Sequence, residues 1–545
     1  MAVTAPLMIA HLFSYQSRSI TGAAVILGLA SLLSRLIGML RDRLFAHSFG
    51  AGEILDAYHA AFRIPDTLYT LIIVGAISAG FIPVLTELLE KDKIEAKQVT
   101  RTLLTLASLL LLLTCGVFFL LAPWLVRLLT PGFDEQTLHL TILLTRVMLV
   151  SPAVLGVSAI VSGVLQTYKA FFVFALTPIM YNIGIMIGNV FLTPYFGPIG
   201  LAYGVVLGTL FHLGIQLPSF YQYGFSLEPL LEWKHAAIKK IGKLMVPRTL
   251  SLSASQLNFI VITVFSSTLG SGSLAVFHFA NNLQSLPVVM IGISFALAAF
   301  PLLSACVVKN ERDQMISYLS ASIRQILFFI IPLTIIFLLL RAQIVRVVLG
   351  TGAFNWDATI QTADALAYFA ISLFAQSLVP LLARAFFALQ DSWTPFLTTL
   401  VGTLATMLFA YGYVKSMGIA GIVLAFSIGM IVQCVLLWLG LRQKLGTLYE
   451  GKIIRFLGKI SIGALLMSFV VQTLKTPLAA VVDMERFWGI FTQGLGAGLG
   501  GLLVFWIVCY VLGLEEMREF QATIKKRLFK QKTIAQDIPQ EEITS

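Results

Sequence analysis

Apolar runs of helical length recur along almost the entire chain, and short polar segments separate them. An α-helix needs about 20 predominantly apolar residues to cross the hydrocarbon core of a bilayer, and most of these runs reach that length. The pattern predicts an all-α, polytopic membrane protein with about fourteen transmembrane helices. The expected spans cover 20–46, 56–89, 103–129, 137–166, 171–194, 199–222, 240–268, 274–305, 319–341, 359–389, 394–414, 419–441, 454–474 and 487–512.

The composition supports a membrane bundle rather than a string of soluble domains. The 545 residues are 58% hydrophobic and 12% charged, with a mean hydropathy of +0.90. A soluble domain carries about 25% charged residues. Each cysteine stands alone in an apolar stretch, so we expect buried, inert thiols and no metal site. The four are Cys115, Cys306, Cys434 and Cys509.

The net charge of +11 indicates topology rather than nucleic-acid binding. Lysine and arginine gather in every second loop, and such loops stay in the cytoplasm. Both termini are therefore expected inside, and residues 1–19 lack the features of a cleaved signal peptide. The basic segments are 90–101, 232–243, 307–315, 441–455 and 524–532.

Segments in the two halves of the chain resemble each other at an offset of roughly 220 residues. "FIPVLTELLEKDKIEAKQ" (81–98) parallels "FPLLSACVVKNERDQM" (300–315), and "FGAGEILDAYHAAF" (49–62) parallels "LGSGSLAVFHFANN" (269–282). An even number of spans in each half gives the repeats a parallel orientation, which predicts two six-helix lobes around a central cavity, as in transporters. The expected parts are a cytoplasmic N-terminus (1–19), an N-lobe (20–222), a linker (223–239), a C-lobe (240–441), two extra helices (454–512) and a cytoplasmic tail (513–545).

Charged side chains inside the first two spans are the main candidates for function. Arg35 falls about 22 Å along the first span, near the bilayer centre, where a charge costs about 2.5–3.5 kcal/mol unless it faces protein or water. Arg41 and Asp42 follow, and Asp56 and Arg63 lie in the second span, where Pro65 should kink the helix. Planar guanidinium groups in a partly dry cavity suit a phosphate or diphosphate. Static salt bridges between helices are the alternative, and either aspartate could orient the arginines or carry a proton.

A second set of candidates lies in the second half. Arg248 and Arg384 could line the cavity, or their side chains could extend to the membrane interface. Asn281 and Asn282 could bind sugar hydroxyls or join neighbouring helices. We expect no enzyme, because hydrolase, metalloprotease and P-loop motifs are absent from the sequence. His59 and His278, which fall at matching repeat positions, are expected to be satisfied core or cavity groups, and Arg43 an interface anchor.

At the first candidate site the sequence is similar to a known family. "SRLIGMLRDRLFAHSFGAGEILDAYHAAFRIPDTL" (34–68) closely resembles the N-terminal signature of the MviN/MurJ family of lipid II flippases. Three later segments match the family in the same order: "GAISAGFIPVL", "SGSLAVFHFANNLQSLP" and "LLARAFFALQDSWTP". The resemblance covers roughly the first 400 residues and extends more loosely to the end.

The resemblance implies two six-helix lobes plus two helices, within the multidrug/oligosaccharidyl-lipid/polysaccharide exporter superfamily. It implies alternating access of a cationic cavity and, as cargo, lipid II, the undecaprenyl-diphosphate-linked precursor of peptidoglycan. The implied setting is cell wall biogenesis in the bacterial plasma membrane, with membrane lipids as partners, no nucleic acid, no cofactor and a monomer, near cell wall synthesis enzymes. Position by position, it assigns substrate binding to Arg35, Arg41, Asp42, Asp56 and Arg63.

Several positions depart from the family pattern. Tyr69 and Thr70 stand where the family often has two arginines, and Val74 stands in place of an acid. Asn281 and Asn282 likewise replace charged residues, so the second half of the charge clamp is missing. One alternative function is export of another polyprenyl-linked oligosaccharide or of a drug-like solute. A less favoured alternative is that of a membrane-embedded transferase acting on polyprenyl substrates. Coupling to an ion gradient or to the membrane potential stays open.

Overall fold

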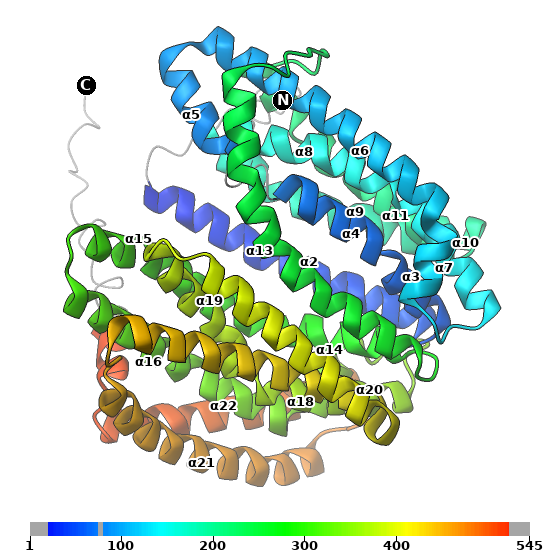
Figure 1. Ribbon diagram of the computed structural model, residues 1–545. Helices are drawn as coiled ribbons and strands as arrows, with labels where there is room; N and C mark the ends of the chain where they lie inside the picture. Colours follow the sequence, from blue (N-terminus) through cyan, green and yellow to red (C-terminus); the bar gives the residue numbers. More distant parts are fainter. Residues whose placement is uncertain (1–19, 75–79, 523–545) are drawn as a thin grey trace, which may run out of the picture. The chain divides into compact units, whose positions relative to one another are not determined.

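The computed structural model describes residues 20–74 and 80–522, and these residues form helices joined by short turns, with no strand among them (Figure 1). The expected N-terminal segment 1–19 and the end of the tail, 523–545, lie outside the described residues. Within the described part, nine helices are long and apolar enough to cross a membrane, or ten if one bent pair counts as a single span. The predicted all-α, polytopic class is confirmed, whereas the expected count of about fourteen spans is not.

The helices of the first half differ widely in length, from four to 37 residues. They are α2 (Ile20–Phe49), α3 (Glu53–Ala61), α4 (Arg63–Tyr69), η1 (Thr70–Val74), α5 (Ile82–Lys91), α6 (Lys93–Leu129), α7 (Glu135–Met148), α8 (Val150–Thr167), α9 (Phe171–Ile187), η3 (Gly188–Leu192), α10 (Thr193–Phe196), α11 (Ile199–Gly214) and α12 (Leu217–Gln222).

The helices of the second half and of the C-terminal addition also differ in length, from six to 53 residues. They are α13 (Ala236–Ser267), α14 (Ser273–Pro287), η4 (Val288–Ile293), α15 (Ser294–Val308), α16 (Arg312–Leu339), α17 (Arg341–Leu349), α18 (Trp356–Ile371), α19 (Leu373–Ala388), α20 (Trp393–Leu445), α21 (Glu450–Val481) and α22 (Phe487–Val511).

Several expected spans are broken helices. The span expected at 56–89 is divided into α3, α4, η1 and α5, and its first break, at Phe62, precedes Pro65. Proline lacks the backbone N–H that would continue the helix, which accounts for a break at this place. Helix α20 contains a non-helical residue, Gly418, with φ 57° and ψ −135°. It therefore comprises two straight segments, which agree with the two spans expected on either side of residue 418.

The described chain contains two compact units that interleave along the sequence. Unit 1 comprises Met1–Leu286, Val348–Ser372 and Asp391–Leu436, and unit 2 comprises Pro287–Val347, Leu373–Gln390 and Leu437–Ser545. The boundaries differ from those of the predicted lobes, because a unit defined by close packing follows helix contacts and a lobe defined by repeats follows sequence similarity. The division into lobes remains a prediction.

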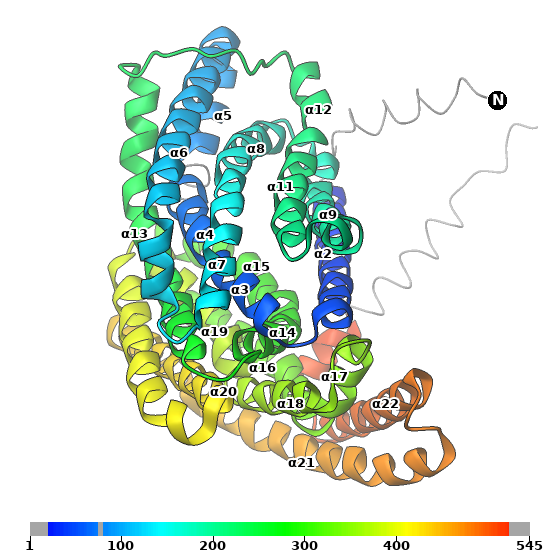
Figure 2. The ribbon, with the colours of Figure 1, turned by 90° about the vertical axis from the view of Figure 1, so that its right-hand side faces the viewer.

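Within unit 1, glycines bring helices α9 and α11 into direct backbone contact. A Cβ added at Gly184 would lie 2.3 Å from the Cα of Gly208, and one added at Gly188 would lie 2.3 Å from the Cα of Gly204. Small residues are the usual means by which membrane helices pack, since lipid provides no hydrophobic driving force between them. Helix α2 lies alongside α9 (Figure 2). Alanine at any of these glycines would force the pair apart.

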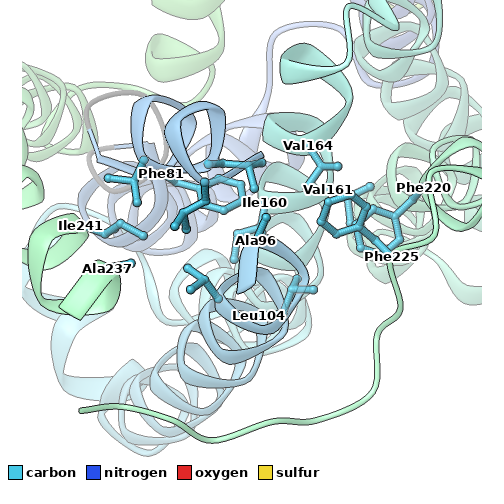
Figure 3. Close-up of a cluster of buried hydrophobic side chains, with 14 of the residues drawn as sticks. Phe81, Ala96, Leu104, Ile160, Val161, Val164, Phe220, Phe225, Ala237 and Ile241 are labelled. Carbon is cyan, nitrogen blue, oxygen red and sulfur yellow. The ribbon is translucent and has the colours of Figure 1, made fainter. Parts of the chain in front are cut away.

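A hydrophobic cluster fixes α5, α6, α8 and the start of α13 to one another within unit 1 (Figure 3). Phe81, Leu104, Ile160 and Phe220 are at most 5% exposed in it. Burying a side chain of this size contributes about 1.5–3 kcal/mol. The cluster therefore stabilises the packing of these helices against one another.

Unit 2 contains the hairpin of α21 and α22, which packs through Gly501 against Val471 and Met467. Helix α21 also packs on α16 within the same unit. All four cysteines of the chain are buried and free, as the sequence predicted. Each thiol lies within an apolar helix, where it behaves as a small hydrophobic side chain.

Candidate functional site

A buried hydrogen-bond network inside unit 1 joins α2 to α9 and α14. Arg41 donates from Nε and Nη2 to the same carboxylate oxygen, Oδ1 of Asp42, at 3.1 and 2.8 Å. Its Nη1 donates to Oδ1 of Asn182 on α9 at 3.0 Å. Asn282 on α14 donates from Nδ2 to the other oxygen of Asp42, Oδ2, at 2.8 Å. The amide orientations follow from the partners, because a guanidinium can only donate and a carboxylate can only accept.

The network fixes the position of the Arg41 side chain but uses only some of its N–H donors. A guanidinium has five N–H donors, and three are used in these contacts. The Asp42 carboxylate is 5% exposed and faces both a cation and an amide. A buried carboxylate of this kind is tolerated because it is paired and hydrogen-bonded. The two remaining donors of Arg41 are oriented in advance for a further acceptor.

Arg35 lies two turns earlier on α2 and reaches the same partner helix. Its Nη1 donates to Oγ of Ser285 at 3.3 Å, and this hydroxyl donates to the backbone carbonyl of Asn282 at 2.9 Å. Arg35 therefore meets a neutral hydroxyl rather than a carboxylate. Arg43, expected as an interface anchor, donates to the backbone carbonyl of Val348 at 3.1 Å.

Asp56 is placed differently from the other candidates. It is 3% exposed, and its two oxygens accept hydrogen bonds from backbone N–H groups of Gly272 and Ala275 at 2.6 and 2.8 Å. These groups are at the start of α14, where the first N–H groups of a helix have no partner within the helix. Asp56 thus caps a helix of the other half of the sequence, and among the described side chains no arginine pairs with it.

Arg63 and two histidines lie next to this network. The Arg63 guanidinium carbon lies 5.3 Å from the ring centroid of Phe259, and its buried Nε has no hydrogen-bond partner among the described residues. His59 stacks on His278 with ring centroids 4.2 Å apart and an interplanar angle of 16°. We expected satisfied imidazoles, but within the described part of the chain the buried Nε2 of His59 has no partner. Two neutral rings can stack in this way where two charged rings would repel each other.

The candidate residues of the second half of the sequence lie in different environments. Asn282 joins the network, whereas Oδ1 of Asn281 accepts a hydrogen bond from Gln284 on its own helix at 3.1 Å. Arg248 lies on α13, and its side chain is outside the described part. Arg384 lies on α19, which belongs to unit 2.

Close backbone approaches surround the capped start of α14. A Cβ at Gly272, which has a φ of +87°, would lie 2.2 Å from the carbonyl oxygen of Ala51. Gly352 approaches His47 equally closely, and the N–H of Ala353 donates to the His47 carbonyl at 2.9 Å. All these residues belong to unit 1 and to loops that the charge pattern places on the outer side. Segments from the two halves of the sequence are packed backbone to backbone here.

Sequence reasoning missed Asn182 and Ser285 as partners of the arginines. Asn182 is a single amide in the apolar segment "IMYNIGIM", and its Nδ2 also donates to the Pro178 carbonyl at 2.9 Å. A lone amide in a membrane helix needs a partner, which is the one signal that could have drawn attention to it.

The fold is shared with transporters of known structure. It matches a structure described as "Lipid II flippase MurJ, inward closed conformation" with a TM-score of 0.74 and 24% identity, over 90% of this chain and 98% of the other. It also matches the inward-facing conformation of a multidrug resistance MATE family transporter of the MOP superfamily, with a TM-score of 0.64 and 17% identity, over 78% and 99% of the two chains. The protein is thus a multi-pass membrane protein with the fold of this class of transporter.

The sequence comparisons identify the family within that class. The family model "Lipid II flippase MurJ" matches residues 45–490. "Lipid II flippase MurJ" of Burkholderia cenocepacia is 30% identical over 426 residues, which cover 76% of this chain and 82% of the relative. A "Probable lipid II flippase MurJ" of Buchnera aphidicola subsp. Acyrthosiphon pisum is 31% identical over 472 residues, 85% and 90% of the two chains. The chain belongs to the MurJ family of lipid II flippases, as its motifs suggested.

Proposed function

We propose that this protein moves lipid II from the inner to the outer leaflet of the bacterial plasma membrane by alternating access. The observation that carries the proposal is the network of Arg41, Asp42, Asn182 and Asn282 in a chain of this family. The network positions Arg41 at membrane depth with two of its N–H donors unused. A second arginine, Arg35, lies two turns away on the same helix. A diphosphate is the part of such a lipid that needs these donors.

Charge balance supports an anionic cargo. Arg35, Arg41 and Arg63 bring three guanidinium groups, Asp42 offsets one of them, and Asp66 acts electrostatically on Arg63, which leaves one positive charge in excess. Asp56 does not offset another, because its carboxylate already meets the positive end of α14. The excess of positive charge fits a diphosphate, and Asp42 orients Arg41 rather than binding cargo itself. The undecaprenyl tail would stay in the lipid.

Asp56 fits a role in the gate rather than in the cargo site. Its two hydrogen bonds join α3 to the start of α14 at the expected outer end, beside the close approaches of Gly272 and Gly352. Opening of the outer side would break these bonds. We therefore assign Asp56 to the closure of the outer gate, in place of the substrate contact expected from the sequence.

The remaining assignments complete the proposal. Both termini face the cytoplasm, because the basic loops lie on that side. The protein works as a monomer, near enzymes of cell wall synthesis, and performs no catalytic step. Coupling to an ion gradient or to the membrane potential would supply direction to the transport.

The test is complementation. Cells depleted of their own lipid II flippase receive this gene, and the accessibility of lipid II on the outer face is measured. We expect growth and accessible lipid II to be restored. Lack of rescue by a protein that is well expressed in the membrane would contradict the cargo, and would favour another polyprenyl-linked oligosaccharide, for which the uncharged Asn281 and Asn282 offer hydrogen-bonding groups.

A further inference from the structure

Unit 2 contains a basic cavity far along the sequence from the candidate site. The cavity has a volume of about 270 Å³ and lies between α16, the first turns of α21 and the segment after α22. A water molecule occupies about 30 Å³ in the liquid, so the space could hold a polar group of several heavy atoms. The charged lining residues are Arg324, Lys452, Arg455, Lys459, Glu515 and Glu516.

The cations in this cavity outnumber their counter-charges. Arg324 pairs with Glu516 at 2.5 Å and approaches Glu515 at 3.5 Å, so one cation faces two carboxylates here. With the other three cations, the lining carries two positive charges in excess. Lys452, Arg455 and Lys459 are exposed and follow one another at helical spacing on α21. No carboxylate pairs with these three among the residues that the structure describes. Their positive charge is available to an anion that enters the cavity.

Two of the three cations are held in place by uncharged groups. The Lys459 ammonium donates to the backbone carbonyl of Leu512, at the end of α22, at 2.9 Å. The Lys452 ammonium lies 5.0 Å from the ring centroid of Tyr449. Neither contact neutralises the charge. The side chains are therefore positioned and still charged, which favours binding of a phosphate oxygen over binding of a neutral solute.

The cavity lies where the bundle meets lipid. Exposed apolar side chains continue along α21 from Ile454 to Leu465, and Trp506 and Tyr510 are exposed near the end of α22. Tryptophan and tyrosine concentrate at membrane interfaces. The neighbouring loop 441–455 is one of the basic loops expected in the cytoplasm, so the cavity faces the inner leaflet.

We propose that this cavity binds the phosphate headgroup of an anionic phospholipid of the inner leaflet. Lys452, Arg455 and Lys459 contact the phosphodiester, and the acyl chains lie along the apolar face of α21. Clusters of basic side chains at the cytoplasmic ends of membrane helices bind anionic headgroups in this way. The site is separate in sequence from Arg35 and Arg41, so it serves the membrane environment rather than the cargo.

The test uses the full chain, purified in detergent, delipidated, and examined by native mass spectrometry with added phosphatidylglycerol. We expect one tightly retained lipid, and at least a tenfold loss of its affinity in Lys452→Gln/Arg455→Gln/Lys459→Gln. A second variant, Lys452→Gln/Arg455→Gln, keeps the Lys459 contact with α22 and should lose most of the same affinity while its thermal unfolding stays unchanged. Arg486→Gln is the matched control, because Arg486 is an exposed cation of the same hairpin that pairs with Asp483 at 3.1 Å.

Two further binding measurements identify the ligand. Phosphatidylcholine, which has no net charge, should not be retained, and millimolar inorganic phosphate should not displace phosphatidylglycerol. Equal retention of the two lipids, equal affinity in the triple variant, or competition by phosphate alone would each overturn the proposal. All these variants should still rescue flippase-depleted cells, so a failure of this proposal is distinguishable from a failure of the proposed transport.

Discussion

Two regions of unit 1 contribute different kinds of polar group to the hydrogen bonds between them. Helices α2 and α3 carry the charges Arg35, Arg41, Asp42 and Asp56, whereas α14 offers an amide, a hydroxyl and backbone N–H groups. Each of these side-chain hydrogen bonds therefore joins a charged group to an uncharged one. A hydrogen bond of that kind is worth about 1.5–3 kcal/mol, whereas breaking a buried ion pair costs about 3–5 kcal/mol. Contacts of the weaker kind suit the separation of these segments that the proposed alternating access requires.

The largest expected effect follows from removing Arg41, which belongs to the one ion pair of this network within the described residues. Arg41→Ala leaves the Asp42 carboxylate buried with only the Asn282 amide, and removes the donors proposed for the diphosphate. We expect complete loss of rescue in flippase-depleted cells. Arg41→Lys keeps the charge without the forked geometry and should rescue partly. Arg43→Gln is the control, and rescue by Arg41→Ala at normal expression would show that the network is only structural.

A charged side chain on α14 should remove the difference between the charged helices α2 and α3 and the uncharged helix α14. Asn282→Asp brings a second carboxylate to the position 2.8 Å from Asp42, where like charges repel. We expect transport to fall at least tenfold, as measured by accessible lipid II. The double variant Asp42→Asn/Asn282→Asp restores one acceptor and one donor and should regain part of the activity. If the double variant were no better than the single one, the direct contact would not be the cause.

Weakening the hydrogen bonds between Asp56 and the start of α14 should have a smaller effect on transport. Asp56→Asn keeps the shape of the side chain but offers one acceptor to two N–H groups, so one hydrogen bond to the start of α14 is lost. The expected result is a severalfold loss of rescue and easier opening of the outer side. Labelling of a cysteine introduced at Ala51 by a membrane-impermeant reagent measures that opening. Faster labelling is expected in the variant, and an unchanged rate would remove Asp56 from the gate.

The smallest effect comes from an aspartate that caps its own helix outside the membrane. Asp134 accepts from the N–H groups of Gln136 and Thr137 at the start of α7. Hydrogen bonding, first from the Thr137 side chain, lowers the pKa of Asp134. A carboxyl with a lowered pKa contributes stability that is present above its unfolded-state pKa and is lost as the pH falls through its folded-state pKa.

Asp134→Ala should therefore lower the melting temperature slightly at neutral pH and not at strongly acidic pH, while transport stays intact. Scanning calorimetry at the two pH values measures the difference. A loss of transport comparable to that of Asp56→Asn would show that the two aspartates do not differ in the way their locations indicate.

The sequence was sufficient for the class of fold, for the family and for the residues of α2. Apolar runs specify membrane helices because a lipid environment requires every backbone group to be paired within a helix. Charges are costly there, so Arg35, Arg41 and Asp42 could be identified as candidates one by one. Pro65 predicted the break near Phe62, and the two separate apolar spans 394–414 and 419–441 predicted an interruption where Gly418 lies.

Only the tertiary structure decided the partners. No local pattern connects Asp42 with Asn282, which are 240 positions apart, or Asp56 with the backbone of Gly272. Asp56 was expected beside the arginines and instead caps a helix, because a backbone N–H group has no signature in the sequence. Hydrophobic periodicity determines where a helix lies in the membrane, whereas the hydrogen bonds of a buried charge depend on which helix packs beside it.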